Sequence, residues 1–521
     1  MFDLVIKNGR IFDGSGNPWF HGDVGITGDT IAQVGVGLEG EKTIDAGGLA
    51  VSPGFIDIHS HSDIPLLVDP RAQSKIRQGV TTEVVGQCGN SAAPMNEKVR
   101  AYRDTYSRSL VPEDFQFDWD TMDSYMRKLE SQGVAVNVAP VVGHGTVRQN
   151  VMGFDNREPT QDELEEMKNL VRQALEEGAW GMSTGLIYPP SVYGKTPEII
   201  ELCKAVSEYD AAYFTHIRGE AETLLEAVEE ACTIGREAAV RVQIAHFKAS
   251  GPANWGKTKE SLALVEKFRS LGVDVTFDQY PYIASSTNLT ALLPHWSMEG
   301  GAEQLLKHLQ DPEARAKMAQ ELRLNYGWDK IMVAKAKNNP QFNGKTIQEI
   351  AQEMGKEPLD AVFELLLQEE AQVPSVMFGM NEEDVRRVMK SPNGMVGSDG
   401  SAICPEGVWR DFVPHPRYYG TFPRVLGHYA RDEKIIPLQE AVRKMTWAPA
   451  RKVGLKDRGL IHPGFKADLV VFNPETVKDK ATFQNPHQYP QGIHYVLVNG
   501  EIVVQNGEHT GRLPGKVLRR N

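Results

Sequence analysis

Cysteine, long apolar runs and excess positive charge are all scarce in this chain of 521 residues. Four cysteines are too few for a disulfide framework in a chain of this length. No apolar run reaches the roughly 18 residues that a membrane span needs. The N-terminus has neither the basic start nor the cleavage site of a signal peptide. We therefore expect a protein of the reducing cytoplasm.

The charge balance is acidic, with a formal net charge of -13 and a sequence pI of about 5.6. Nucleic acids and anionic membranes bind proteins through basic faces. The composition therefore argues against both as partners. It leaves a small-molecule substrate open, because one local Arg or Lys is enough to bind an anion. The oligomeric state is not determined by the sequence.

Both ends of the chain are rich in short strand-like segments, whereas the middle alternates strands with amphipathic helices. Turn residues separate the strand-like segments in the first fifty and the last sixty residues. The alternating middle is typical of a parallel sheet or barrel. We predict an α/β protein with one β domain built from residues 1–52 and 456–521, around a catalytic domain of residues 53–455. A charged helical stretch near residues 288–345 predicts an insertion at the top of the barrel.

The alternation also predicts individual elements. Expected strands lie at 81–85, 134–139, 212–215, 241–245, 273–277 and 395–397, and expected helices at 161–177, 221–235 and 259–271.

A His-Ser-His triplet at residues 59–61 ends the apolar run of residues 49–58. Residues i and i+2 of a strand point to the same face, so the imidazoles of His59 and His61 project together. They lie at the C-terminal end of the strand, where α/β barrels keep their chemistry. Two neighbouring imidazoles of this kind suit a divalent metal ion.

Four more side chains able to bind metal directly follow apolar runs: Cys88, His216, His246 and Asp399. The strand ends of a barrel share one mouth, so all these side chains are predicted to converge there. Histidine, cysteine and carboxylate together favour Zn²⁺ over Mg²⁺ or Ca²⁺, and a thiolate can bridge two ions. A single strand-end histidine is more often a structural hydrogen-bonding group, and a single buried cysteine an inert apolar residue. The joint pattern favours a metal site.

Longer motifs surround these residues. They are residues 53–63 (PGFIDIHSHSD), 463–470 (PGFKADLV), 86–89 (GQCG) and 183–190 (STGLIYPP). On these motifs the chain resembles the amidohydrolase superfamily and, within it, the D-aminoacylase (N-acyl-D-amino-acid deacylase) family. The first two motifs mark the superfamily as a whole, whereas the last two resemble those of the deacylases alone. The likeness runs nearly from end to end.

This resemblance implies a (β/α)8 TIM-like metal-dependent hydrolase barrel and a small β-sandwich made from both termini. It implies a tight zinc site formed by Cys88, His216 and His246. A second, weaker metal position would use His59, His61 and Asp399, with Cys88 as a shared ligand in one alternative. Many relatives in the superfamily bridge two metals with a carboxylated lysine on the fourth strand. Residues 179–186 contain no lysine, and we expect Cys88 to take that role.

The implied reaction is hydrolysis of a linear amide, the bond between the acyl group and the nitrogen of an N-acyl-D-amino acid. Zinc lowers the pKa of water toward about 7 and so supplies a nucleophile at neutral pH. Asp399, at the mouth of the last strand, is placed to accept the proton of this water and to return a proton to the leaving amine. The alternative for Asp399 is a helix N-cap.

Substrate contacts also come from the resemblance. It places Lys248, Arg417, Tyr280 and Ser286 at the α-carboxylate of the substrate, and Tyr188 near the scissile carbonyl. Arginine suits a carboxylate because its planar fork donates two parallel hydrogen bonds. Ordinary surface charge is the alternative for the two cations, and simple packing is the alternative for Tyr280.

The loop between Asp399 and Arg417 looks longer than in the family, and Arg410 within this loop competes with Arg417 for the carboxylate. His144 is open between a supporting role at the site and a purely structural one. Specificity for the D-enantiomer rests on the resemblance alone, and the preferred side chain and acyl group stay open.

Three other functions remain. A cyclic amidohydrolase, such as a dihydroorotase or hydantoinase, uses the same barrel, but the absent strand-four lysine and the Cys88 motif weigh against it. A dipeptidase specific for D-residues is compatible with the same site. A barrel that has lost catalysis and serves as a binding subunit is disfavoured, because all six candidate ligands are present.

Overall fold

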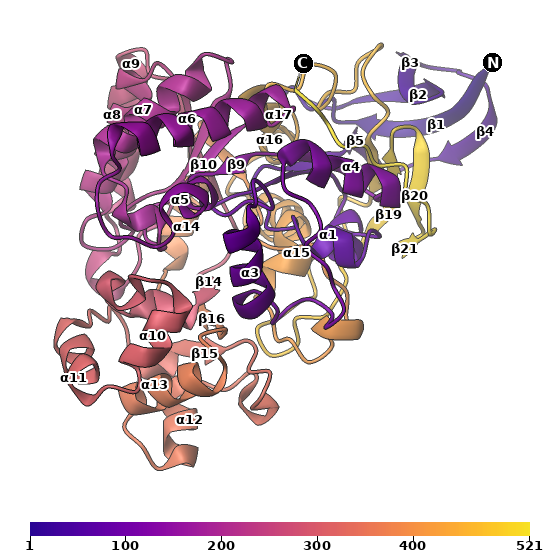
Figure 1. The fold of residues 1–521 in the computed structure, drawn as a ribbon. Coiled ribbons are helices and arrows are strands. Elements are labelled where there is room, and N and C mark those ends of the chain that lie inside the picture. Colours follow the sequence, from indigo (N-terminus) through magenta and orange to yellow (C-terminus); the bar gives the residue numbers. More distant parts are fainter. Residues whose placement is uncertain (521) are drawn as a thin grey trace.

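Eight parallel strands form the barrel at the centre of the computed structural model, which describes residues 1–520 (Figure 1). They are β6 (Phe55–Asp57), β7 (Val80–Val85), β8 (Asn137–Pro140) continued by β9 (Val142–Gly143), β10 (Gly181–Gly185), β11 (Ala212–His216), β12 (Arg241–Ile244), β13 (Val275–Gln279) and β17 (Gly394–Val396). In one sheet β7 pairs with β6 and β8. In another sheet the strands pair in the order β9, β10, β11, β12, β13 and β17. A parallel bridge between Ser60 and Gly400 brings the first and last strands together. The predicted strands are confirmed to within a few residues.

Amphipathic helices cover the outside of these strands, among them α6 (Gln161–Glu176), α7 (Thr196–Ser207), α8 (Leu224–Glu237) and α9 (Thr258–Ser270). Helix α6 begins at a capping box, in which Thr160 and Glu163 each accept from the other's backbone N–H. Met167, Val171, Ala174 and Leu175 form its buried stripe. This spacing of four and seven residues is what turns one helix face to the strands. The helices predicted at 161–177, 221–235 and 259–271 are confirmed.

Both ends of the chain build one nine-stranded sheet beside the barrel. It contains β1 (Phe2–Ile11), β2 (Phe20–Thr27), β3 (Thr30–Gly35), β4 (Gly40–Asp45) and β5 (Ala50–Pro53), together with β18 (Leu469–Phe472), β19 (Ile493–Val498), β20 (Glu501–Gln505) and β21 (Glu508–His509). Strand β5 pairs with β1 on one side and β18 on the other, so it joins the two ends of the chain. The fold is therefore a (β/α)8 barrel with a small β-sandwich, as the resemblance implied.

The insertion forms a body of its own against the barrel (Figure 1). Strands β14 (Ser285–Asn288), β16 (Pro374–Met377) and β15 (Ile331–Val333) make an antiparallel sheet. Helices α10 (Ala302–His308), α11 (Pro312–Glu321), α12 (Ile347–Met354) and α13 (Pro358–Gln368) surround it. These elements share a hydrophobic core separate from that of the barrel.

The insertion extends past its predicted end at residue 345. Ile350 of α12 and Val362 and Leu366 of α13 lie in the same core as Ile331 of β15. The error has a physical reason, because α12 and α13 are amphipathic and resemble the helices of the barrel in sequence. None of the helices in residues 1–520 has both the length and the apolar character needed to cross a bilayer.

Candidate metal centre

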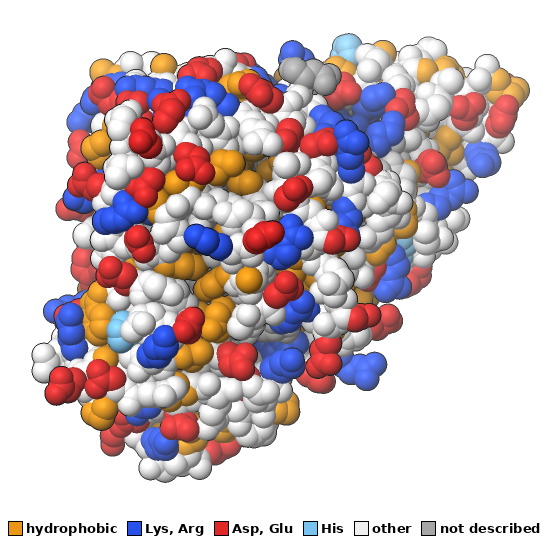
Figure 2. Space-filling view, viewed as in Figure 1, with side chains coloured by type: hydrophobic (Ala, Val, Ile, Leu, Met, Phe, Trp, Pro, Cys, Tyr) orange, Lys and Arg blue, Asp and Glu red, His pale blue; other side chains and the backbone are white. Residues whose placement is uncertain are grey.

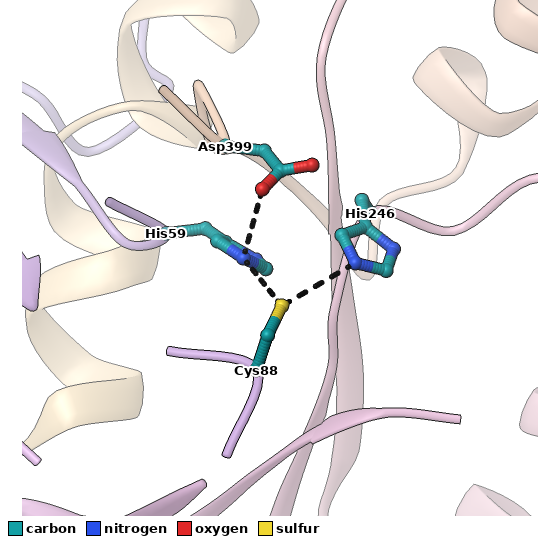
Figure 3. Close-up of side chains that lie close together, drawn as sticks. All are labelled: His59, Cys88, His246 and Asp399. Carbon is teal, nitrogen blue, oxygen red and sulfur yellow. Dashed lines mark hydrogen bonds and ion pairs between the residues drawn. The ribbon is translucent and has the colours of Figure 1, made fainter. Parts of the chain in front are cut away.

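Cys88 lies close to three of the predicted histidine ligands, and Figure 3 draws its contacts with two of them, His59 and His246. Its Sγ is 3.4 Å from His59 Nε2, 3.7 Å from His216 Nδ1 and 3.6 Å from His246 Nε2. A tetrahedral zinc ion with a Zn–S bond of about 2.3 Å and Zn–N bonds of about 2.0–2.1 Å separates such ligand atoms by roughly 3.6 Å. The spacing of these side chains therefore fits zinc without rearrangement.

Asp399 joins the cluster from the opposite side. Its Oδ1 lies 3.4 Å from His59 Nε2 and 3.0 Å from His61 Nε2. One ligand atom each from His59, Cys88, His246 and Asp399 lies within 4.8 Å of all the others. The two predicted ligand sets, one around Cys88 and one around Asp399, thus interleave in a single centre.

Contacts on the side away from the ligand cluster orient the imidazole of His59 and the backbone of His246. Asp278 Oδ1 lies 3.2 Å from His59 Nδ1 and accepts a 2.8 Å bond from the backbone N–H of His246. Gln243 donates to the other oxygen of Asp278. A carboxylate on one nitrogen of a histidine fixes the tautomer and frees the other nitrogen for a metal. His59 is therefore held with Nε2 directed into the cluster.

Glu220 orients His246 in the same way, on the other side of the cluster. Its Oε1 lies 2.9 Å from His246 Nδ1, opposite the nitrogen that faces Cys88. His216 Nε2 is buried without a hydrogen-bond partner, although Glu220 Oε2 lies 3.9 Å away. A buried imidazole with an unused nitrogen costs free energy in the folded protein unless a ligand meets it. This nitrogen faces Glu220, whereas the other ring nitrogen, Nδ1, faces Cys88 and is the one placed to bind a metal there.

Three residues of the centre have left-handed backbone conformations. The φ angles are +52° at Cys88, +35° at His246 and +51° at Asp399. Non-glycine residues seldom adopt this region, and each such residue costs on the order of 1–3 kcal/mol. The fold thus strains the chain at the strand ends in order to turn these side chains inward.

The charge states suit metal binding. Burial raises the pKa of Cys88, but the charge of His59 and hydrogen bonds from the surrounding histidines lower it well below its usual value overall. Burial likewise raises the pKa of Asp399, but the charge of Arg417 and the surrounding histidines together lower it well below the usual value. A thiolate and a carboxylate are the forms that bind zinc.

The centre opens into a cavity of about 720 Å³. One wall comes from α3 (Glu97–Tyr106) and the loop after it, the second from residues 187–191, and the third from the insertion. Gln372 of the insertion accepts hydrogen bonds from the backbone of residues 108 and 109, which joins two of these walls. Figure 2 shows hydrophobic side chains gathered where the insertion meets the barrel. The volume lies in the roughly 300–1,000 Å³ range of sites for drug-sized ligands.

Tyr188 and Arg417, two of the predicted substrate contacts, line the cavity and have hydrogen-bond donors without a partner. Thr287 donates a 3.0 Å hydrogen bond to the hydroxyl oxygen of Tyr188, which leaves the Tyr188 proton free for a substrate. Burial raises the pKa of Tyr188 well above its usual value, so this proton is retained. Arg417 Nε is buried without an acceptor, and its Nη1 lies 2.8 Å from Asp399 Oδ2 without hydrogen-bond alignment.

Lys248 and Ser286 also line the cavity, and Lys248 is already paired. Its Nζ forms an ion pair of 2.5 Å with Glu220 and lies 2.9 Å from His246 Nδ1. Lys248 therefore belongs to the support of His246 as well as to the cavity wall.

Tyr280 and Arg410 are not part of the cavity wall. Tyr280 is absent from the cavity wall, and its hydroxyl points at Met380 Sδ, 3.8 Å away. Its ring packs under the Arg417 guanidinium, 4.6 Å from the ring centroid. The predicted contact between Tyr280 and the substrate stays a prediction, and the contact observed for its ring is the one with Arg417. Arg410 is exposed and outside the cavity, which leaves Arg417 as the arginine near the centre.

His144 is structural. It lies 2.7 Å from Ser191 Oγ and 2.8 Å from Glu198 Oε1, and Arg148 pairs with the same glutamate. These contacts satisfy both ring nitrogens away from the ligands.

Sequence reasoning missed Asp278 and Glu220. Asp278 directly follows the predicted strand 273–277, so it satisfied the criterion that singled out the ligands. Glu220 lies four residues after His216, within the loop that leaves β11. No motif marked either residue, but both positions were accessible to the same strand-end argument.

Comparison with known proteins places this geometry in context. The sequence model of the amidohydrolase family matches residues 42–504. D-aminoacylase of Alcaligenes xylosoxydans xylosoxydans is 39% identical over 521 residues, which is 100% of this chain and 98% of that protein. The N-acyl-D-aspartate and N-acyl-D-glutamate deacylases of the same organism are each 36% identical, over 99% and 100% of this chain and 95% and 97% of their own lengths.

Solved structures agree with the sequence comparison. A D-aminoacylase with a binuclear metal centre is 39% identical with a TM-score of 0.85, and all of both chains is covered. N-acyl-D-glutamate deacylase from Bordetella bronchiseptica, complexed with zinc and a phosphonate that mimics the tetrahedral intermediate, is 35% identical with a TM-score of 0.85 over 99% of both chains. A D-hydantoinase is 17% identical with a TM-score of 0.57 over 100% of this chain and 99% of its own, a likeness of fold alone.

Proposed function

The chain belongs to the amidohydrolase family, and from this premise we propose that it is a zinc-dependent N-acyl-D-amino-acid deacylase. It hydrolyses the amide bond of an N-acyl-D-amino acid to a carboxylate and a free D-amino acid. The observation that carries the proposal is Cys88 Sγ within 3.4–3.7 Å of three histidine nitrogens. Three relatives that span nearly the whole chain are deacylases of N-acyl-D-amino acids by name.

Zinc would be held tightly by Cys88, His216 and His246, and a second, weaker position would use His59, His61 and Asp399. When bound, zinc supplies a water of lowered pKa and polarises the amide carbonyl. The protein contributes ligands fixed in advance, because Asp278 and Glu220 hold two of the imidazoles from behind. Little reorganisation is then needed when substrate arrives.

Asp399 moves the protons in this proposal. Its low pKa keeps it a carboxylate at neutral pH, so it accepts a proton from the attacking water. It then returns the proton to the amine nitrogen, because an unprotonated amine leaves poorly. Arg417, 2.8 Å from Asp399 Oδ2, favours the carboxylate form between turnovers.

Arg417, with Lys248 and Ser286, would bind the α-carboxylate of the substrate. Arg417 lines the cavity with two donors, Nε and Nη1, that have no hydrogen-bond partner, and a planar guanidinium holds a carboxylate through two parallel hydrogen bonds. Tyr188 would donate its free proton to the scissile carbonyl oxygen. Tyr280 supports Arg417 through its ring.

Hydrolysis of a cyclic amide is the alternative on the same fold. Strand β10, the fourth of the barrel, carries no lysine that could be carboxylated, and Cys88 occupies the centre instead. A D-residue-specific dipeptidase is also compatible with these ligands. Both alternatives are separated from the deacylase by their substrates.

The test compares matched N-acetyl-D- and N-acetyl-L-amino acids, dihydroorotate, hydantoin and dipeptides ending in a D-residue. The enzymes are the zinc-loaded protein and Asp399→Asn. We expect D-selective release of amine, lost in the variant by a factor of roughly 10²–10⁴. Ring opening without deacylation would move the protein to the cyclic amidohydrolases. Absence of turnover with zinc bound would contradict an enzymatic role on all these substrates.

A further inference from the structure

A fully buried lysine, Lys75, lies between two segments that carry half of the proposed ligands. We call residues 59–61 the first ligand segment and residues 398–400 the last ligand segment. Backbone hydrogen bonds join them, from Asp399 N to His59 O at 2.8 Å and from His61 N to Gly400 O at 2.9 Å. The relative placement of the two segments sets where His59, His61 and Asp399 meet.

The ammonium group of Lys75 contacts both segments. Its Nζ donates to Ser398 Oγ at 2.6 Å and to the carbonyl of Gly400 at 3.1 Å. It also donates to Ser60 Oγ at 3.4 Å. Lys75 therefore holds the residue before Asp399, the residue after it, and the residue between the two histidines.

Two buried carboxylates complete the network. Asp57 lies 2.6 Å from Lys75 Nζ and also accepts a 2.9 Å hydrogen bond from the backbone N–H of Ser398. Glu83 lies 3.2 Å from Lys75 Nζ and accepts from the hydroxyls of Ser60 and Ser62 at 2.9 Å each. The side chains of Lys75, Asp57 and Glu83 are all 0% exposed.

Stability alone does not account for such a network. Buried ion pairs lose most of their Coulomb attraction to desolvation, and well-packed apolar residues often stabilise as well or better. Glu83 Oε2 is even left buried without a partner. Buried charges of this kind are instead suited to fixing one arrangement among several.

The backbone of Asp399 lies in the left-handed region at φ +51°, so its conformation has to be held in place by other groups. A strained residue of this kind persists only where its surroundings determine its conformation. Lys75 holds both neighbours of Asp399 at once, through the Ser398 hydroxyl and the Gly400 carbonyl. Removal of the ammonium would free this turn to relax away from the histidines.

We propose that Lys75 is a positioning residue that sets the His59, His61 and Asp399 metal position through Asp57, Glu83 and Ser398. The proposal rests on the proposed function, since it takes these residues as metal ligands. The Cys88, His216 and His246 position has other supports, Glu220 and Asp278, and no contact with Lys75. Loss of Lys75 therefore weakens one metal position and spares the other.

The experiment is a titration of the metal-free protein with Co²⁺, followed by absorption. A cobalt–thiolate band reports the Cys88 position, and the remaining ligand-field spectrum reports further uptake. Lys75→Met removes the ammonium, and Ser398→Ala removes one of its contacts with less risk to folding. Ser398→Thr keeps the hydroxyl and serves as the conservative rescue. Lys452→Met is the matched control, because Lys452 is nearly as buried as Lys75 and pairs with Asp274 instead.

In the native protein we expect two uptake steps. In Lys75→Met and Ser398→Ala the weaker step should lose roughly 10–100-fold in affinity, while the thiolate step changes little. With zinc at a fixed concentration, kcat should fall with little change in KM. Ser398→Thr and Lys452→Met should titrate like the native protein.

Equal weakening of both steps, or of neither step, would overturn the proposal and leave the network a structural role. A native protein that binds no cobalt or zinc at all would overturn the proposed function, and this inference with it. Since the titration needs no substrate, an error about the substrate does not affect the result.

Discussion

His59 Nδ1 lies 3.2 Å from Asp278 Oδ1, while Nε2 of the same ring lies 3.4 Å from Cys88 Sγ. The ring therefore has one nitrogen on a carboxylate and the other in the ligand cluster. Asp278 also receives the backbone N–H of His246, so one carboxylate orients two ligands that follow different strands of the barrel, β6 and β12. This relationship makes Asp278 a sensitive point of the site.

Asp278→Asn should lower zinc affinity by roughly 10–100-fold, because the amide supports the Nδ1 proton of His59 less well than a carboxylate does. Chelator competition with the purified protein measures this. Asp274→Asn is the control, since Asp274 lies just before the same strand, is half exposed and pairs with Lys452 instead of a ligand. Unchanged zinc affinity in Asp278→Asn would contradict the assigned role.

Among the four cysteines, Cys88 should be the one that reacts in the folded, metal-free protein. It lines the cavity as a thiolate, whereas burial raises the pKa of Cys232 to about 12 and of Cys404 to about 11. Cys203 is fully buried, and burial raises its pKa well above the usual value. Thiolates, not thiols, are alkylated.

Iodoacetamide treatment at neutral pH, followed by intact mass and peptide mapping, checks this. We expect one alkyl group on Cys88, and protection when zinc is added first. Rapid modification of any other cysteine before unfolding, or labelling of Cys88 that zinc does not slow, would count against the metal site.

Arg417→Lys should raise KM for N-acyl-D-amino acids by roughly 10–100-fold, because a lysine cannot offer two parallel hydrogen bonds to a carboxylate. A smaller loss of kcat is also expected, since Arg417 lies 2.8 Å from Asp399. Arg410→Lys, at an exposed position outside the cavity, should change neither constant.

Substrate amides supply the second arm of this test. An N-acetyl-D-amino acid amide has no α-carboxylate, so it should be a poor substrate of the native enzyme and should lose only the smaller kcat effect in Arg417→Lys. An equal additional loss on the amide would mean that Arg417 acts on something other than the carboxylate.

Lys444 should make stability depend on pH in the alkaline range. It is buried and donates to the carbonyl of Gly394, and burial lowers its pKa from 10.5 to about 8 against the opposing charge of Glu440. Between about pH 8 and 10.5 the unfolded chain binds more protons at this residue than the folded chain, so the free energy of unfolding rises with pH. The gain is roughly 3 kcal/mol across the window.

Urea unfolding of the native protein and of Lys444→Met measures this contribution. The difference in free energy of unfolding, native minus variant, should grow from about pH 8 to pH 10.5 and be flat below pH 8. Lys390→Met, at an exposed position, should follow the native curve. Parallel curves for Lys444→Met and the native protein would contradict the lowered pKa.

The parts of the site that the sequence predicted are those that depend on local position. Cys88, His216 and His246 each follow an apolar run, and a parallel barrel brings all strand ends to one mouth. Their position at strand ends was therefore enough to predict that these three side chains lie close together. The barrel strands were predictable for the same reason, since each is a short buried run between turns.

Lys75 could not be predicted in this way. It lies in the four-residue helix α2 (Gln73–Ile76), and lysines are seldom fully buried. Its burial depends on Asp57, Glu83 and the last ligand segment, which are separated from it in sequence by up to 325 residues. The packing of Tyr280 under Arg417 could not be predicted for a related reason, because the side on which a residue after a strand points depends on its neighbours.

The insertion has a consequence for how this enzyme can change over evolution. Residues 285–377 bring their own hydrophobic core and supply one wall of the cavity, while every proposed ligand belongs to the barrel. Substitutions in that wall can alter which side chains or acyl groups enter without disturbing the strand ends. Part of the substrate range is thus encoded in a separately packed part of the chain, which can diverge while the reaction chemistry is conserved.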